Sequence, residues 1–297
     1  MKYAAPVRSC TIRGQSGASR WELVTRPPAP ALRPYLRDLC GYTETTPGLH
    51  RRREFPLPQV VVIFEFGPPV RIHDRGSSDS WRFPGGFVAG VDDGVSLTEH
   101  DGFQQGLQAN LTPLGGRVLF GLPMSELTGR VVSLDDALPP AHRGLAARLH
   151  GQRDWDARFD LFEQVLGERI AGAPPPSGPV TWAVREIEER GGAVDVRALA
   201  RAMGYSQRHT IALFREHVGV PPKRLARLVR FDRLIRHLKQ GGEGTWADLA
   251  LQFGYYDQSH LVRDVREFTG ITPTRARVLL LDFTAGEEPA PARAPIA

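Results

Sequence analysis

The feature of this sequence that most constrains its fold is a short internal repeat near the C-terminus. The segment Leu199-Ala-Arg-Ala-Met-Gly-Tyr205 reappears as Leu249-Ala-Leu-Gln-Phe-Gly-Tyr255, at an offset of fifty residues. Beyond the turn that follows, the offset becomes fifty-one, so that His209 matches His260. Two copies of so short a unit indicate a duplicated supersecondary motif rather than a solenoid.

Each copy of the repeat has the residues that a helix-turn-helix unit requires. An alanine lets a second helix cross the first closely, and a glycine four residues later permits a tight turn. A residue that caps a helix N-terminus follows the turn. In the two copies these positions are Ala200 and Ala250, Gly204 and Gly254, and Ser206 and Asp257. We therefore predict two helix-turn-helix units; the alternative is an ordinary helical hairpin with a solvated polar face.

The second helix of each unit is predicted to have one apolar face and one face of long polar side chains. The apolar face of the first copy contains Leu213 and Phe214 with either Ile211 or Thr210, and that of the second contains Leu261, Val265 and Phe268. The polar faces carry Gln207, Arg208 and Arg215 in the first copy, and Gln258, Ser259, Arg263 and Arg266 in the second. Side chains of these types bind guanine, adenine and phosphate.

Positive charge is concentrated in the part of the chain that contains the repeat. Residues 180–281 hold 17 Lys/Arg and 11 Asp/Glu, a net charge of +6, whereas residues 1–179 have a net charge of +1. Such a bias is expected of a module that binds phosphates. Apolar spacing predicts a long helix from about residue 222 to 240 between the two copies, ended by the glycines of 241–244.

The second copy reads Phe253-Gly-Tyr-Tyr-Asp-Gln-Ser-His-Leu-Val-Arg-Asp-Val-Arg-Glu-Phe-Thr-Gly-Ile-Thr-Pro273 and is followed by Arg275-Ala-Arg277. This stretch closely resembles the signature of the AraC/XylS family of bacterial transcription regulators, and the resemblance extends over about residues 180–281. It implies two helix-turn-helix subdomains joined by the helix at about 222–240. It also implies that each second helix enters a major groove, and successive grooves on one DNA face lie roughly 34 Å apart.

The resemblance further implies which residues face DNA. The base-reading candidates are Arg208, Ile211 and Ala212 in the first unit and Gln258, Ser259 and Arg263 in the second, with Ser206, Gln207, Arg215, Asp257 and Arg266 beside them. The candidate phosphate contacts are Lys223, Arg224, Arg227 and Arg275. Ile211 and Ala212 stand where polar readers are common, which favours an apolar contact to thymine methyl groups in the first unit.

The N-terminal half is predicted to be rich in strands. Runs of β-branched, aromatic or alternating apolar residues predict strands at Gln59–Phe66, Phe87–Val91 and Gln104–Leu111. A helical period follows at Phe159–Ile170. The segments Pro27–Leu36, Gln59–Phe66 and Phe120–Asp135 resemble, more loosely, an uncharacterised domain found on actinobacterial-type members of the family, which implies a cupin-like β fold with added helices.

We therefore predict an α+β fold of two domains. The N-terminal domain, residues 21–170, is β-rich and cupin-like with appended helices, and it senses an effector or dimerises. A Pro/Gly-rich linker at 171–179 leads to an all-α DNA-binding domain at 180–281. Residues 1–20 and 285–297 are predicted to be disordered tails because of their polar, Gly/Ser-rich or Ala/Pro-rich composition.

No signature of enzyme chemistry is present. His50, His73 and His100 are scattered, and the sequence has no zinc-ligand spacing, nucleophile turn, P-loop or dinucleotide fingerprint. Cys10 and Cys40 fit a reducing compartment, with a disulfide between them as the lesser alternative. We expect no catalytic residues, metal or cofactor, and a cytoplasmic protein without a signal peptide or membrane span.

Three functions are compatible with these features. The first is a transcription regulator that binds DNA and senses a small molecule, with Trp21, Glu65 and Trp81 as candidate pocket residues. In the second, the N-terminal domain only dimerises or binds a protein partner. The third is an enzyme with a DNA-binding tail, such as an alkyl-transfer repair protein, which the isolated cysteines disfavour. Candidate partners are double-stranded DNA, an effector, RNA polymerase and a second copy of the chain, for which the apolar face of Phe159–Ile170 is either a dimer contact or packed on its own domain.

Overall fold

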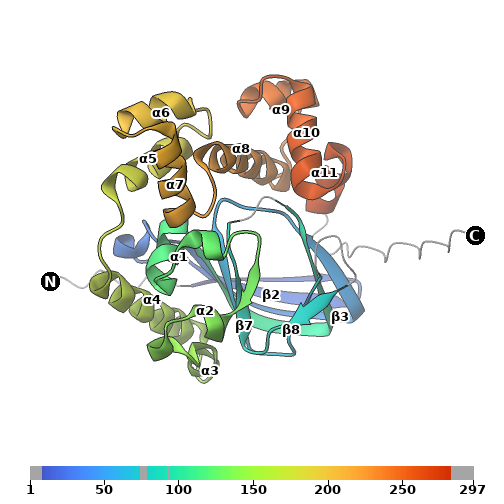
Figure 1. Ribbon diagram of the computed structural model, residues 1–297. Helices are drawn as coiled ribbons and strands as arrows, with labels where there is room; N and C mark the ends of the chain where they lie inside the picture. The colour runs from blue at the N-terminus through green and yellow to red at the C-terminus, as the bar shows by residue number, and fades with distance from the viewer. Residues whose placement is uncertain (1–8, 74–78, 92–93, 282–297) are drawn as a thin grey trace, which may run out of the picture.

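The computed structural model describes residues 9–73, 79–91 and 94–281. An antiparallel sheet with four helices beside it forms the N-terminal part, and seven helices form the C-terminal part (Figure 1). This is the two-part α+β fold that the residue patterns predict. Among the described residues, no helix is long and apolar enough to cross a membrane.

The sheet is built around two long paired strands. Its order is β1-β2-β3-β8-β4-β7-β9, with β5 paired to β6 and β8. The strands are β1 Cys10–Ser16, β2 Ser19–Arg26, β3 Leu36–Glu54, β4 Val60–Glu65, β5 Arg71–His73, β6 Ser80–Arg82, β7 Gly86–Ala89, β8 Ser96–Leu111 and β9 Val131–Ser133. Between Thr45 and Leu49 the register of β3 against β8 shifts, and such irregularities bend a strand pair.

One face of the sheet packs against helices. Val60, Val62 and Phe64 of β4 are fully buried on this face, and Phe64 meets Phe162 edge-on at 5.6 Å between ring centroids. The covering helices are α1 Pro113–Phe120, α2 Leu134–Ala137, α3 Leu145–His150 and α4 Trp155–Gly172. The opposite face, reached by the alternate residues of each strand, lines a cavity.

The apolar face of α4 packs on its own domain. Phe159, Phe162, Val165 and Leu166 are buried within the single chain. Of the two alternatives for this face, the structure therefore favours the intradomain one, and a dimer contact through these side chains is wrong. The periodicity predicts an apolar face correctly but does not say which surface will cover it.

The prediction of a disordered tail over residues 1–20 is wrong for residues 10–20, which form β1 and the start of β2. The two strands pair from Cys10 opposite Thr25 to Ser16 opposite Ser19. Gly17 makes the tight turn between them with φ +56°, a conformation that glycine adopts without strain. Residues 1–8 and the predicted tail at 285–297 lie outside the described residues.

The predicted strands and helices of the remaining chain are present with shifted ends. The strand at Gln59–Phe66 is β4, Phe87–Val91 overlaps β7, and Gln104–Leu111 is the second half of β8. The predicted linker is shorter than its composition indicates, since α4 continues to Gly172 and the next helix begins at Gly178.

The C-terminal helices are arranged as two similar pairs around one long helix. They are α5 Gly178–Glu189, α6 Val196–Ala202, α7 Gln207–His217, α8 Pro222–Lys239, α9 Trp246–Gln252, α10 Gln258–Thr269 and α11 Pro273–Leu281. Figure 1 shows α6 and α7 at one end of α8 and α9 to α11 at the other. Leu225, Leu228, Val229, Leu234, Ile235 and Leu238 of α8 are buried, as the apolar spacing predicts.

Candidate functional site

The two repeats fold into two helix-turn-helix units, α6–α7 and α9–α10. The turn glycines Gly204 and Gly254 have φ of +75° and +74°, so a residue with a Cβ would be strained there. The Ser206 hydroxyl accepts a hydrogen bond from the backbone N–H of His209 at 3.2 Å, and the Asp257 carboxylate accepts one from that of His260 at 2.7 Å. Both predicted N-caps are therefore confirmed.

The resemblance places the second helix of each unit, α7 and α10, against DNA, and we call these helices the first and second reading heads. The first, α7, exposes Gln207, Arg208, Ala212 and Arg215. Thr210 rather than Ile211 occupies the core position beside Phe214, and both Thr210 and Phe214 are fully buried. The Thr210 hydroxyl donates to the carbonyl of Ser206 at 3.0 Å, which satisfies the buried hydroxyl. Ile211 is half-buried. The exposed face of α7 is therefore more polar than expected from the sequence, which places Ile211 among the residues that face DNA.

The second reading head, α10, separates its two faces more sharply. Leu261, Val265 and Phe268 are buried, whereas Gln258, Ser259, Arg263 and Arg266 are exposed. The side chains proposed to read DNA therefore lie together on the exposed face. The buried Asp264 interrupts the apolar face, and its environment shows how the head is fixed.

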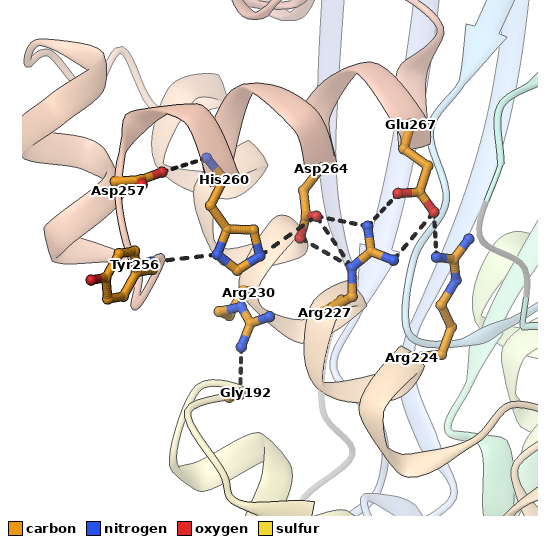
Figure 2. Close-up of polar contacts among 9 residues, drawn as sticks. All are labelled: Gly192, Arg224, Arg227, Arg230, Tyr256, Asp257, His260, Asp264 and Glu267. Atoms are coloured by element: carbon orange, nitrogen blue, oxygen red, sulfur yellow. Dashed lines mark hydrogen bonds and ion pairs between the residues drawn. The ribbon is translucent and has the colours of Figure 1, made fainter.

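Ion pairs hold α10 onto α8. Arg227 of α8 binds Asp264 at 2.7 Å and Glu267 at 2.5 Å, and Glu267 also binds Arg224 (Figure 2). Asp264 is 1% exposed, and the guanidinium of Arg227 lies over the ring of Phe268. The hydrogen bond from Arg227 lowers the pKa of Glu267 to about 2, so this carboxylate is ionised at neutral pH.

This network corrects part of the predicted phosphate-binding set. Arg224 and Arg227 are engaged with carboxylates of α10 and support the orientation of the reading head instead. Lys223 and Arg275 are exposed near the beginnings of α8 and α11, where phosphate can reach them. A pairing between residues 37 positions apart, such as Arg227 with Asp264, has no local sequence signal.

A third arginine of α8, Arg230, binds the loop that precedes α6. Its guanidinium donates to the carbonyl of Gly192 at 3.0 Å, in the loop before α6 (Figure 2). Gly192 has φ +80°, and a Cβ there would clash with the backbone of Ala226. Arginines of α8 therefore bind α10 of the second unit and the loop that precedes α6 of the first.

The N-terminal part contacts both reading heads near their C-terminal ends. The Thr128 hydroxyl donates to the carbonyl of Gly219, just after α7, at 2.9 Å. Arg53, at the end of β3, donates to the carbonyl of Thr269 at the end of α10, at 3.0 Å. These contacts leave the N-terminal turns of α7 and α10, with their polar side chains, exposed.

A cavity of about 1090 Å³ lies on the open face of the sheet. Its polar side follows the β3–β8 pair, where Gln108 donates to Asn110 at 2.9 Å and Asn110 donates to Asp38 at 2.6 Å. Further along the same pair lie Glu44, Arg52, His100 and Gln104. Its apolar side is formed by Val61, Ile63, Ile72, Phe83 and Phe87.

The polar groups of the cavity interact with one another through hydrogen bonds and charge. Burial acts to raise the pKa of Glu44, but hydrogen bonds with His100 and Gln104 and the charge of Arg52 lower it to about 2. Nε2 of the buried His100 side chain lies 3.6 Å from the Glu44 carboxylate, whereas its Nδ1 has no hydrogen-bond partner among the described residues. A buried polar group without a partner is costly unless water or a ligand supplies one.

Trp21 and Trp81 line this cavity as predicted, but Glu65 does not. Glu65 lies at the end of β4, and its carboxylate accepts the backbone N–H of Val70 at 3.0 Å. Burial raises its pKa to about 7. The prediction that Glu65 belongs to the pocket is therefore wrong: it stabilises the connection from β4 to β5.

The polar residues of β8 that line the cavity are absent from the predicted set. The alternation that places Leu107, Ala109 and Leu111 on one face of the strand also places Gln104, Gln108 and Asn110 on the other. That signal is present in the sequence, but it does not distinguish a polar cavity from solvent. Cys40 also lines the cavity, Cys10 is exposed in β1, and neither forms a disulfide.

Two helix-turn-helix units with exposed polar reading faces define a DNA-binding protein. Comparison with known families then gives a model described as "Helix-turn-helix domain" over residues 199–278 and a domain of unknown function, DUF6597, over residues 24–133. The chain therefore carries a C-terminal helix-turn-helix domain of the AraC type, as the resemblance implies, and is an AraC-like transcription regulator.

Solved structures that match this chain include ToxT from Vibrio cholerae, with 10% identity over 81% of this chain and 99% of that chain and a TM-score of 0.47. ToxT from Vibrio cholerae with a bound unsaturated fatty acid gives 8% identity, 81% and 96% coverage and a TM-score of 0.45. The AraC-like transcriptional activator CuxR gives 16% identity, 80% and 88% coverage and a TM-score of 0.29. No curated protein matches the chain by sequence.

Proposed function

We propose that this regulator binds its operator through α7 and α10, and that a small molecule in the sheet cavity controls that binding. The composition of the cavity wall supports control by a small molecule. Besides the strands, it includes Ile235 and Lys239 of α8 and Leu279 and Leu280 of α11. A ligand in the cavity would therefore touch the N-terminal sheet and the DNA-binding helices at once.

We propose that the exposed N-terminal turns of α7 and α10 read the DNA bases. Arginine binds guanine and glutamine binds adenine through paired hydrogen bonds in the major groove. The proposed readers are Gln207, Arg208 and Ala212 on α7 and Gln258, Ser259 and Arg263 on α10. Arg215 and Arg266 lie in the last turns of these helices, beside the readers. Lys223 and Arg275 are proposed to bind phosphate, which positions the protein without reading sequence.

We expect Arg263→Ala to weaken binding to the selected DNA site by about 1–3 kcal/mol and to relax preference at one base pair, because a bidentate base contact is lost. The measurement is a gel-shift titration of the full-length protein with duplexes selected from a random pool. Arg153→Ala is the matched control, since Arg153 is exposed in a loop before α4. Unchanged affinity and preference in Arg263→Ala would refute this assignment.

On the ligand side, the cavity has one hydrogen-bonding wall and one aromatic and aliphatic wall. It therefore fits an amphipathic small molecule with a polar edge and an apolar face. Control of DNA binding requires that the ligand bind the DNA-competent and incompetent states with different affinity. Contact with both α8 and the sheet is the structural means for that difference.

We expect an effector found by thermal-shift screening of the full-length protein to stabilise it by about 2.7 kcal/mol at a hundredfold excess over its Kd. Gln108→Leu should abolish this stabilisation, because it removes a polar group from the hydrogen-bonding wall while keeping its volume. Glu22→Ala is the control, since Glu22 is adjacent to Trp21 in β2 and alternation places it on the opposite face.

The screen also separates the two roles proposed for the N-terminal part. If no small molecule stabilises the protein while DNA binding persists, the sheet domain acts through protein contacts instead, and the effector proposal fails without affecting the DNA-binding assignment.

A further inference from the structure

The two helix-turn-helix units differ by one inserted residue. Tyr205 is followed directly by the N-cap Ser206, whereas Tyr255 is followed by Tyr256 and then by the N-cap Asp257. This insertion is the reason that the repeat offset changes from fifty to fifty-one. Tyr255 is 4% exposed and occupies the position of Tyr205, whereas Tyr256 has no counterpart and is 88% exposed.

The inserted tyrosine is held at a defined place. Its backbone N–H lies 3.4 Å from Nδ1 of His260, and Nε2 of His260 lies 3.8 Å from Asp264. Asp264 in turn binds Arg227 of α8. Figure 2 shows Tyr256 beside the beginning of α10, with its hydroxyl directed away from His260. The turn that carries Tyr256 is therefore connected to the same network that orients the reading head.

The surroundings of Tyr256 favour a polyanion. The N-terminus of α10 carries the positive end of the helix dipole, and Arg263 and Arg266 lie exposed on the same helix. A recognition helix places its N-terminal residues against base edges in the major groove. A residue just before its N-cap therefore reaches the border of the groove, where the sugar–phosphate backbone runs. Tyrosine is among the side chains that bind phosphate oxygens there.

We propose that Tyr256 is a DNA-backbone contact specific to the second reading head, with its hydroxyl donating to a phosphate. This inference rests on the proposed placement of α10 in a major groove. The contact differs in kind from that of a lysine or arginine, because a neutral hydroxyl binds phosphate without neutralising its charge. It therefore contributes affinity without releasing a counterion.

The test compares Tyr256→Phe and Tyr256→Ala in the full-length protein, using a duplex selected from a random-sequence pool and a scrambled duplex of equal length. Loss of one hydrogen bond to an anion should weaken binding about tenfold, which corresponds to about 1.4 kcal/mol. We expect the loss on both duplexes, because phosphate contacts carry no sequence information. The dependence of log Kd on log salt should keep its slope.

Two control variants make the result specific. Lys223→Ala, which removes a proposed cationic phosphate contact, should reduce the salt slope by about one. Leu251→Ala removes an exposed side chain from α9 of the same unit and should leave affinity unchanged. Thermal unfolding should be unaltered in the Tyr256 variants because the side chain packs on little.

Three outcomes would overturn the proposal. The first is unchanged affinity in both Tyr256 variants. The second is a loss confined to the selected sequence, which indicates base reading. The third is normal DNA affinity with loss of transcription when RNA polymerase is added, which indicates a protein contact. If Arg263→Ala also has no effect on DNA binding, the placement of α10 itself is wrong, so the two failures are distinguishable.

Discussion

We expect Asp264→Ala to lower the free energy of unfolding by about 3–5 kcal/mol, because it removes one partner of a buried ion pair and leaves the other charge in place. Asp264 is 1% exposed, and the Arg227 side chain it binds is 16% exposed. The measurement is urea-induced unfolding of the full-length protein, followed by helical circular dichroism. DNA affinity should fall as well, since Asp264 fixes α10 to α8.

Two further variants separate this cause from a general loss of charge. Glu189→Ala breaks the exposed pair with Arg185 within α5 and should leave the free energy of unfolding nearly unchanged, because solvent screens this pair. The double variant Arg227→Met with Asp264→Leu removes both charges together and should recover most of the lost stability. A loss near that of Glu189→Ala in the single Asp264 variant would show that the pair contributes little.

The helix-turn-helix units were predictable because their signals are local. The small residue, the turn glycine and the N-cap lie within eight residues of one another, and each has a physical role that one sequence reveals. The roles of Arg224 and Arg227 were not predictable in this way. Both lie near the start of a basic helix, which is also the pattern of a phosphate contact, and only the crossing of α8 by α10 shows their carboxylate partners.

The lining of the cavity was also only partly predictable from the sequence. Strand alternation predicts which residues share a face, but Trp21 and Trp81, which line the cavity, lie outside the strands that the sequence pattern predicts. Strand alternation places Glu65 on the same face as Val61 and Ile63. Glu65 lies at the end of the strand, however, where the chain turns back and the backbone N–H of Val70 donates to its carboxylate. The alternation of side chains along a strand determines the face on which a residue lies. The connection after the strand determines whether the side chain of a residue at the strand end reaches the cavity.

Three aromatic rings connect the cavity wall with the second reading head. Phe55, which lines the cavity, meets Phe231 of α8 edge-on at 6.4 Å between ring centroids. Phe231 contacts Phe268 of α10 at 5.0 Å. Phe231 and Phe268 are fully buried, so a displacement of Phe55 that moves Phe231 requires rearrangement of this packing.

Phe231→Ala is therefore expected to affect both stability and regulation. Loss of a fully buried phenyl ring costs about 3–5 kcal/mol, through lost burial and the cavity that remains. Phe231→Leu retains more volume and should cost less, which keeps the protein folded for a binding assay. In that variant we expect the effector to bind with little change in affinity but to alter operator affinity less than it does in the wild type.

The two readouts are urea unfolding and gel-shift titration with and without the effector identified by thermal shift. Phe103→Ala is the control, because Phe103 is an exposed aromatic on β8 of the same sheet, and its loss should cost less than about 1 kcal/mol. An unaltered effector response in Phe231→Leu would show that the signal passes by another contact, with Arg53 and Thr269 as the remaining link between β3 and α10. The expected weakening in Phe231→Leu with a normal response in Phe103→Ala would instead place the coupling in the buried aromatic contact, because Phe231 packs between Phe55 of the cavity wall and Phe268 of the reading head, whereas Phe103 contacts neither.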